Sequence, residues 1–265
     1  MNLRKYLKVY KKFLHTSLAS ELEYKTNILV DLITAILSLV GSIFLLSIFF
    51  QNNGYIGGWK FEQALIIQAI YTILNGITNT WFNPNLTEIV KHIREGTLDF
   101  VLLKPIDSQF FISLKKINPS GFLEIMLGFF LLSYCIRINQ INLNLSFLIL
   151  SLITISCSIC ILYSLWFFIS TTTIWFVKTW NAIEVLRSFL YIGRFPLSSF
   201  SFSLRIFFSV FIPIAFITTI PSEVFLGLTV YWKILLEIIK LNTTAGFYLL
   251  KNLNLILKNY LVFLI

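Results

Sequence analysis

Basic residues and long apolar runs alternate along this chain, and the alternation restricts it to folds that cross a membrane several times. Three polar gaps are rich in Lys and Arg, and the gaps between them are almost free of both. The rich gaps contain Arg4, Lys5, Lys8, Lys11, Lys12 and Lys25, then Lys91, Arg94, Lys104, Lys115 and Lys116, then Lys178, Arg187, Arg194 and Arg205. The poor gaps contain only Lys60, only Arg137 and, around Glu223, no basic residue. Since cytoplasmic loops retain Lys and Arg whereas translocated loops lose them, the pattern predicts a cytoplasmic N-terminus.

The composition agrees with a lipid environment. The chain is 57% hydrophobic and 12% charged, whereas about 25% of the residues in soluble domains are charged. Its net charge of +9 is spread over the gaps that flank the apolar runs and is not gathered in one patch. We therefore expect anionic membrane lipid as the counter-charge and no nucleic-acid partner.

Several apolar segments approach the roughly 20 residues that a helix needs to cross the hydrocarbon core. They predict an all-α, polytopic integral membrane protein of about six transmembrane helices, at residues 28–50, 64–82, 122–136, 145–177, 206–220 and 224–239. Pro213 and Pro221 predict a bent or re-entrant helix for the fifth of these. One membrane domain over residues 1–240 is the economical interpretation. Residues 241–265, dotted with Asn and Lys, form an atypical segment that is not assigned as a span.

Residues 3–22 predict an amphipathic helix ahead of the first span. Its apolar residues recur at spacings of three and four, with lysines largely on the other faces. Such a helix suits the headgroup region of a membrane. The alternative is a solvated helix packed on a partner.

Residues that could carry catalysis are sparse. His15 and His92 belong to different segments, so no paired-His metal site is expected. Cys157 and Cys160 have C-x-x-C spacing, but no further Cys or His stands nearby, and we expect them to be buried small side chains. The sequence contains no G-x-x-x-x-G-K-[ST] motif, so this chain has no P-loop with which to bind ATP.

Acidic residues at membrane depth are limited to Asp31, Glu124 and Glu237, each near a predicted span boundary. Intramembrane enzymes and proton-driven carriers usually place ionisable groups nearer the bilayer centre, so this distribution argues against catalysis. We expect Glu124 to pair with Lys115 or Lys116 at the boundary; the alternative is a contact with substrate.

The long internal loop, residues 84–119, contains a predicted short helix. Thr87 is expected to N-cap it, and Gly96 is placed to end it. Ile89, Val90 and Ile93 recur at helical spacing, so we expect an amphipathic helix lying along the membrane surface. Held between two spans, it would be a surface on which a partner can push; the alternative is an ordinary interfacial helix.

Two motifs resemble those of bacterial permeases of the type-two ATP-binding-cassette (ABC) exporters. The first reads IREGTLDFVLLKPIDSQF over residues 93–110, and it matches the family's pattern with Arg94, Gly96, Thr97, Leu98, Asp99, Lys104 and Pro105. The second, over residues 195–227, has the family's residues at Pro196, Arg205, Pro213, Ala215, Phe216, Pro221 and Gly227. The resemblance covers residues 1 to about 230. Beyond it, the chain departs from the family's clean sixth span with Lys233, Glu237 and Lys240.

The resemblance implies a six-span permease subunit with an interfacial N-terminal helix, in the bacterial inner (plasma) membrane. Such permeases work as dimers of one permease or of two paralogues, on a separate pair of P-loop ATPase subunits. ATP would thus be used by the partner, and this chain would bind no cofactor. The segment that couples to the ATPase would comprise Thr87, Ile89, Val90, Ile93, Arg94, Glu95, Gly96, Asp99, Lys104 and Pro105.

The translocation path is expected to be lined by Asn75, Asn79 and the bend at Pro213. Two other classes of function stay open. An integral membrane enzyme acting on lipid would need clustered acidic residues, and the nearest approximation is Asp99 with Asp107. A membrane assembly factor that transports nothing is the third possibility.

Overall fold

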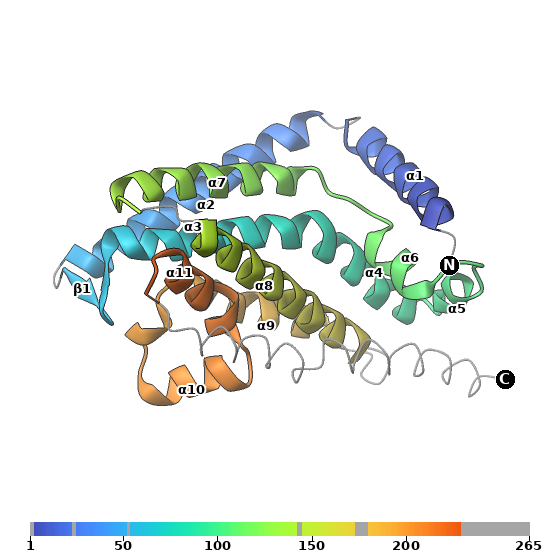
Figure 1. Ribbon diagram of the computed structural model, residues 1–265. Coiled ribbons are helices and arrows are strands. Elements are labelled where there is room, and N and C mark those ends of the chain that lie inside the picture. The colour runs from blue at the N-terminus through green and yellow to red at the C-terminus, as the bar shows by residue number, and fades with distance from the viewer. Residues whose placement is uncertain (1–2, 23–24, 52–53, 142–144, 173–179, 229–265) are drawn as a thin grey trace.

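The computed structural model describes residues 3–22, 25–51, 54–141, 145–172 and 180–228. Within these ranges the chain consists of helices, one two-stranded antiparallel hairpin and the short loops and turns that connect these elements (Figure 1). The elements, in chain order, are α1 Leu3–Leu22, α2 Lys25–Gln51, β1 Tyr55–Ile56, β2 Trp59–Lys60, α3 Phe61–Ile77, the π-helix η1 Thr78–Phe82, α4 Asn83–Arg94, α5 Leu98–Leu102, α6 Ser108–Leu114, α7 Ser120–Ile138, α8 Leu145–Thr172, α9 Trp180–Tyr191, the 3-10 helices η2 Ile192–Arg194 and η3 Leu197–Ser199, α10 Phe202–Val210, the π-helix η4 Ala215–Thr219 and α11 Ile220–Phe225.

The central element is α3, which runs between α7 and α2 on one side and α8 and α11 on the other (Figure 1). Every residue from Ala64 to Leu74 is buried. A helix that is apolar on all sides must be covered on all sides, and this explains its place. The buried Gln68 gains a partner in α2, because its Nε2 donates to Ser42 Oγ at 2.8 Å.

Glycines let α7 approach α3 until the two backbones touch. A Cβ placed on Gly76 would lie 2.8 Å from the carbonyl oxygen of Gly121, and one placed on Gly128 would lie 2.8 Å from the amide nitrogen of Ile73. Small residues at helix contacts are typical of membrane bundles, where close van der Waals packing replaces the hydrophobic effect. The rotation of α7 relative to α3 is therefore fixed at these glycines.

The second predicted span does not end at residue 82. The chain stays helical from α3 through η1 into α4, so the prediction of a loop that begins at Pro84 was wrong. A proline inside a helix deprives the carbonyl four residues earlier of its donor. Here that carbonyl belongs to Thr80, and it accepts instead from the backbone N–H of Asn118 at 3.0 Å. The helix therefore passes through Pro84 without leaving the buried Thr80 carbonyl unpaired.

Three described helical segments are long and apolar enough to cross a membrane, or up to four if the bent pair α10 and η4–α11 counts as one span. They are Leu29–Gln51, Ser120–Ile138 and Phe147–Thr172, and the two halves of the bent pair meet at 79°. The predicted break in the fifth span is thus confirmed. By itself α3 is only 17 residues long, and most of the predicted sixth span lies outside the described residues, as do residues 241–265. The predicted total of six stays a prediction.

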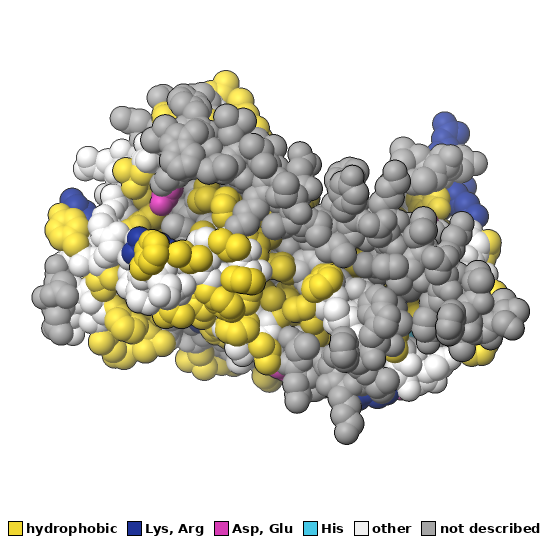
Figure 2. Space-filling view, turned by 90° about the horizontal axis from the view of Figure 1, so that it is seen from below, with side chains coloured by type: hydrophobic (Ala, Val, Ile, Leu, Met, Phe, Trp, Pro, Cys, Tyr) yellow, Lys and Arg dark blue, Asp and Glu magenta, His cyan; other side chains and the backbone are white. Residues whose placement is uncertain are grey.

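The described surface carries many large apolar side chains, as a lipid-facing surface should. Figure 2 shows yellow apolar side chains gathered on part of one face, which is seen from below the view of Figure 1. Elsewhere on the surface, the exposed apolar side chains include Leu37, Phe44 and Phe49 of α2 and Phe130 of α7. Cys160 of α8 is also exposed, so the expectation that it is buried was wrong.

Candidate functional site

The predicted coupling segment forms one end of the molecule, where α4, α5 and α6 lie together beside the start of α1 (Figure 1). The end of α4 is built as predicted around Gly96, whose φ of +66° is a left-handed conformation that suits glycine. Its N–H donates to Ile93 O at 3.3 Å, and the N–H of Thr97 donates to His92 O at 2.9 Å. These two bonds satisfy the last carbonyls of the helix and turn the chain into α5.

Thr87 does not cap this helix. It lies in the second turn of α4, and its Oγ1 donates to Asn83 Oδ1 at 3.2 Å. The prediction was wrong because the chain arrives at Asn83 already helical, so α4 needs no cap. Asn83 Oδ1 also accepts from Arg187 Nη2 of α9, at 3.0 Å. Sequence reasoning did not link Asn83 with Arg187, because the two residues are 104 positions apart in the chain.

The apolar face of α4 packs on protein, although the sequence predicted that the helix would lie along the membrane surface. Ile89 and Val90 are buried in one cluster with Phe111 and Ile112 of α6 and Trp166 of α8. This position explains the 3- and 4-residue spacing of its apolar residues without a lipid contact. The helix is held in the bundle from three sides, by α6, α8 and α9.

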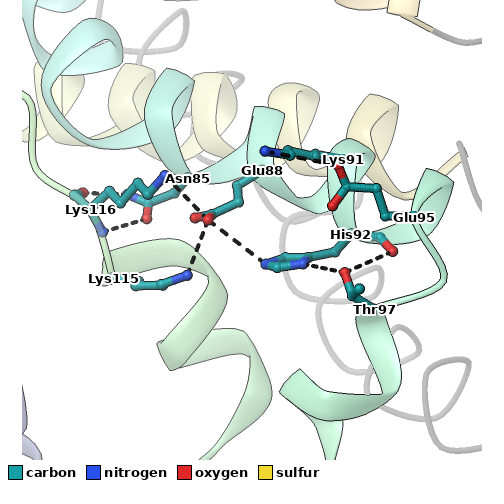
Figure 3. A network of polar contacts seen from close by, with 8 residues as sticks. All are labelled: Asn85, Glu88, Lys91, His92, Glu95, Thr97, Lys115 and Lys116. Carbon is teal, nitrogen blue, oxygen red and sulfur yellow. Dashed lines mark hydrogen bonds and ion pairs between the residues drawn. The ribbon is translucent and has the colours of Figure 1, made fainter.

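Glu88 is the centre of a charged network on the polar side of α4 (Figure 3). Its Oε1 lies 3.1 Å from Lys115 Nζ, 3.2 Å from Lys116 Nζ and 3.8 Å from His92 Nε2. Burial acts to raise the pKa of Glu88, but the hydrogen bonds and charges of the two lysines outweigh it and lower this pKa. The pKa of His92 is lowered, chiefly because burial disfavours its charged form. The network joins α4 to the end of α6.

Asn85, also shown in Figure 3, holds the same junction through the backbone. It is buried, and its Oδ1 accepts from Lys116 N at 2.7 Å while its Nδ2 donates to Lys116 O at 2.6 Å and to Trp81 O at 2.7 Å. The sequence offered a weak signal for this junction in the Lys115-Lys116 pair, but nothing in it linked those lysines to Asn85 and Glu88.

Beyond Gly96, α5 presents an exposed apolar tip. Phe100 and Leu103 are 71% and 74% exposed. They lie between the predicted site residues Asp99, in the first turn of α5, and Lys104, whose Nζ lies 3.9 Å from the centroid of the Phe111 ring. Sequence reasoning saw an apolar patch here and did not single out these two residues. Of the predicted segment, Arg94 and Glu95 are exposed beside the tip, whereas Ile89 and Val90 are buried.

The N-terminal helix α1 lies against this end. Lys5 Nζ donates to Pro105 O at 3.3 Å, and Tyr6 OH accepts from Asp107 N at 3.3 Å. Further along, Phe13 packs edge-on against Phe111, with ring centroids 5.6 Å apart. These contacts order the α5–α6 connection at Pro105. Whether α1 also lies in the headgroup region stays a prediction.

The expected path residues Asn75 and Asn79 meet Glu124 of α7. Asn75 Nδ2 donates to Glu124 Oε2 at 2.7 Å, and Asn79 Nδ2 lies 2.9 Å and 3.1 Å from its two carboxylate oxygens. The expectation that Glu124 pairs with Lys115 or Lys116 was wrong, because both lysines are engaged by Glu88. The Gly76–Gly121 contact turns Glu124 toward α3 and not toward the loop.

Asn75 and Asn79 also border a cavity of about 30 Å³ between α3, α8, α9 and the bent helix. Both π-helices face it, through Thr78 of η1 and Thr218 of η4. Pro213 is buried at the bend, but the lining residue there is its neighbour Ile214. π-Helical insertions are frequent at functional sites. The structure brings the predicted asparagines, but not Pro213 itself, to this cavity, and a role of these residues in a translocation path stays a prediction.

The two acidic residues considered for an enzyme lie at the starts of two different helices. Asp107 caps α6 by accepting from Phe110 N at 2.8 Å, and Asp99 lies in the first turn of α5. Among the described residues, no three His, Cys, Asp or Glu side chains are grouped so that they could hold a metal ion.

A comparison with models of known protein families shows to which family the chain belongs. The model for "ABC-2 family transporter protein" matches residues 36–259, most of the chain. The match runs from within α2 through α11 and into the C-terminal segment outside the described residues. Neither a curated protein nor a solved structure gives a significant match. The matched region and the apolar helices together make this a multi-pass membrane protein, and the chain belongs to the ABC-2 family of transporter proteins.

Proposed function

We propose that this chain is the permease subunit of an ABC exporter in the bacterial inner membrane, with its N-terminus in the cytoplasm. It would form the translocation path as a dimer with a second copy or a paralogue. ATP would be hydrolysed by a separate P-loop ATPase that docks on the α4–α6 end. The family membership supports a transporter component and not an enzyme. Export, the dimer and the inner membrane rest on the resemblance of residues 93–110 and 195–227 to exporter permeases.

The observation that carries the proposal is the unbroken helical run from α3 to α4. It starts at the hairpin end, passes Asn75 and Asn79, and reaches Arg94 beside the exposed tip (Figure 1). A displacement of the tip by a partner would be transmitted to the expected path residues along one continuous helix. Because Asn85 and Glu88 also bind the linker that leads into α7, the same displacement would move two helices of the bundle.

The docking element in this proposal is the tip of α5, not the apolar face of α4 that the sequence suggested. Phe100 and Leu103 project from the end of the molecule, whereas the apolar residues of α4 are already buried. A large exposed apolar patch with a polar rim is typical of a protein–protein contact, in which a few anchor residues contribute most of the binding energy. Arg94, Glu95 and Lys104 would form the charged rim.

The test is purification of the chain from its native membranes in mild detergent, with identification of co-purifying proteins by mass spectrometry. The wild type should retain a P-loop ATPase. The double variant Phe100→Asp, Leu103→Asp should lower its recovery roughly tenfold or more, since anchor residues contribute about 2 kcal/mol or more each. The control is Tyr55→Asp, at an exposed position on the hairpin at the opposite end, which should leave recovery unchanged.

Two results would count against the proposal. Full recovery of the ATPase with the double variant would show that the tip of α5 is not part of the contact with the ATPase. The absence of any ATPase from intact, inserted wild-type protein in several detergents would contradict the permease function itself and favour a membrane enzyme or an assembly factor. The direction of transport is tested separately: an exporter should accumulate its substrate inside inside-out membrane vesicles that are supplied with ATP.

A further inference from the structure

Arg194 brings a positive charge to the middle of α3. Its guanidinium carbon lies 4.8 Å from the centroid of the Tyr71 ring and 4.0 Å from that of Tyr191. Nη2 reaches Ser38 Oγ of α2 at 3.5 Å, while the buried Nε has no hydrogen-bond partner among the described residues. The two rings hold the planar group in place and leave donors available.

Glu124 brings a negative charge to the same helix. Asn75 and Asn79 fix its carboxylate with three close contacts of 2.7 to 3.1 Å. A carboxylate can accept about four hydrogen bonds, so capacity is left for another donor. A second carboxylate, that of Asp31, lies on α2. Asp31 comes seven residues, or two helical turns, before Ser38, so it shares a face of α2 with the serine that contacts Arg194.

Glu124 and Arg194 act on each other electrostatically, but neither forms a direct ion pair with another described residue. Within those residues the ion pairs closer than 4.0 Å involve neither Glu124 nor Arg194. Charged side chains inside a membrane bundle are costly, and they typically mark the pathway of a substrate or ion. Lys115 and Arg187 do form direct ion pairs, with Glu88 and Glu184, and Arg187 also borders the 30 Å³ cavity.

The two groups lie along one face of α3. Tyr71, Asn75 and Asn79 follow one another at intervals of four residues, so each is about 6 Å further along the helix. Arg194 stacks on the first, and Glu124 binds the second and third. All three α3–η1 residues border the 30 Å³ cavity, together with Gly193 beside Arg194.

We propose that this face binds a zwitterionic group, with its ammonium end at Glu124 and its anionic end at Arg194. A charge-assisted hydrogen bond at each end would give each side chain the direct ion-pair partner that it does not have among the described residues. The cavity holds about one water molecule at its present size, so binding requires it to widen, and the π-helices that border it are the segments where the helices can yield. The inference rests on the proposed function, since it names the substrate class of the expected path.

The test is equilibrium binding to the purified full-length chain in detergent, without any ATPase. The probes share one dodecyl tail: dodecylphosphoethanolamine carries both charges, dodecylamine only the ammonium and dodecyl phosphate only the anion. The wild type should bind the first probe roughly tenfold more tightly than either of the others, because only that probe satisfies both ends. Free phosphoethanolamine distinguishes the source of the ligand: binding of the tail-less compound indicates a soluble substrate, and binding only of the tailed one indicates a lipid.

The variants separate the two ends. Glu124→Gln should weaken the zwitterion and the amine roughly tenfold and leave the phosphate unchanged, and Arg194→Gln should do the converse. Arg194→Lys keeps the charge and should retain part of the affinity. Lys60→Gln, at an exposed position on β2, is the control and should change nothing.

Equal weakening of all three probes, or changes below about twofold in both variants, would overturn the proposal and leave the two charges as packing contacts. Because no ATPase is present, this result is independent of whether the chain docks one. A failed ATPase co-purification with intact selectivity for the zwitterion would contradict the proposed function alone.

Discussion

The backbone carbonyl of Thr80 accepts its hydrogen bond from the N–H of Asn118, at 3.0 Å, and not from its own helix. Pro84 makes this necessary, because it has no N–H to offer. The consequence is that the linker before α7 is attached to the α3–α4 run at the point where that run contains a π-turn. Movement of α4 would therefore reach α7 as well as α3.

The first prediction concerns this bond. Asn118→Pro removes the N–H and leaves the Thr80 carbonyl, in a fully buried residue, without a partner. We expect a loss of about 1–3 kcal/mol in the free energy of unfolding, the cost of an unsatisfied buried group. Asn118→Ala is the matched control: it keeps the N–H and loses only the side-chain contacts with Ser120. Denaturation in detergent that gives the same stability for both variants would contradict the assignment.

The second prediction concerns Asn85. Asn85→Ala removes both hydrogen bonds to the Lys116 backbone and the one to Trp81 O. Because these groups stay buried, we expect a loss of about 2–3 kcal/mol of stability. Asn85→Asp should also destabilise, since a carboxylate cannot donate to the two carbonyls. Thermal unfolding measures both. A loss below about 0.5 kcal/mol for Asn85→Ala, the range of ordinary surface changes, would be the contrary result.

The third prediction is a pH dependence at Glu88. Its pKa is lowered from the ordinary value of 4.5 in the folded chain. Its contribution to stability is thus complete above that value and is lost as the pH falls through the folded pKa. His92 acts in the same sense, because its pKa in the folded chain lies below the ordinary value of 6.5. Protonation is therefore harder in the folded chain than in the unfolded one, and stability falls as the pH drops from 6.5 toward the folded pKa.

The measurement is the melting temperature between pH 3.5 and 8, for the wild type, Glu88→Gln and His92→Gln. The difference in melting temperature between the wild type and Glu88→Gln should be largest near neutral pH, and it should shrink below about pH 4.5. Comparison with His92→Gln isolates the stability that His92 loses as the pH falls below 6.5. A constant difference over the whole range would show that Glu88 is not held charged by Lys115 and Lys116.

Much of the helical frame follows from local pattern. The apolar runs predicted α2, α7 and α8 to within a few residues where they are described, because a span is decided by the composition of its own segment. Gly96 was identified for a similar reason: a residue in a left-handed conformation at a helix end is most often glycine. The break in the fifth span followed from Pro213 in the same way.

The wrong predictions share one cause: the contacts that decide each of these positions are made by residues far away in the sequence. Pro84 reads as a stop because nothing near it shows that Asn118 will take over the Thr80 carbonyl. Glu124 reads as a partner of Lys115, since the rotation of α7 is set by Gly76 and Gly121 across two helices. The charged network at Glu88 likewise depends on where the end of α6 comes to lie.

The last prediction tests that helix contact. Gly128→Ala would place a Cβ 2.6 Å from the Ile73 side chain and 2.8 Å from its backbone nitrogen, so α7 must move away from α3. We expect a loss of about 1–3 kcal/mol, the usual cost of overpacking. Gly41→Ala is the matched control, because a Cβ there has no atom within 4 Å and α2 should gain from the better helix former. Unfolding in detergent should separate the two variants in opposite directions. Equal stability would mean that α7 can shift without cost, and then Gly76 and Gly121 could not fix the position of Glu124 against Asn75 and Asn79.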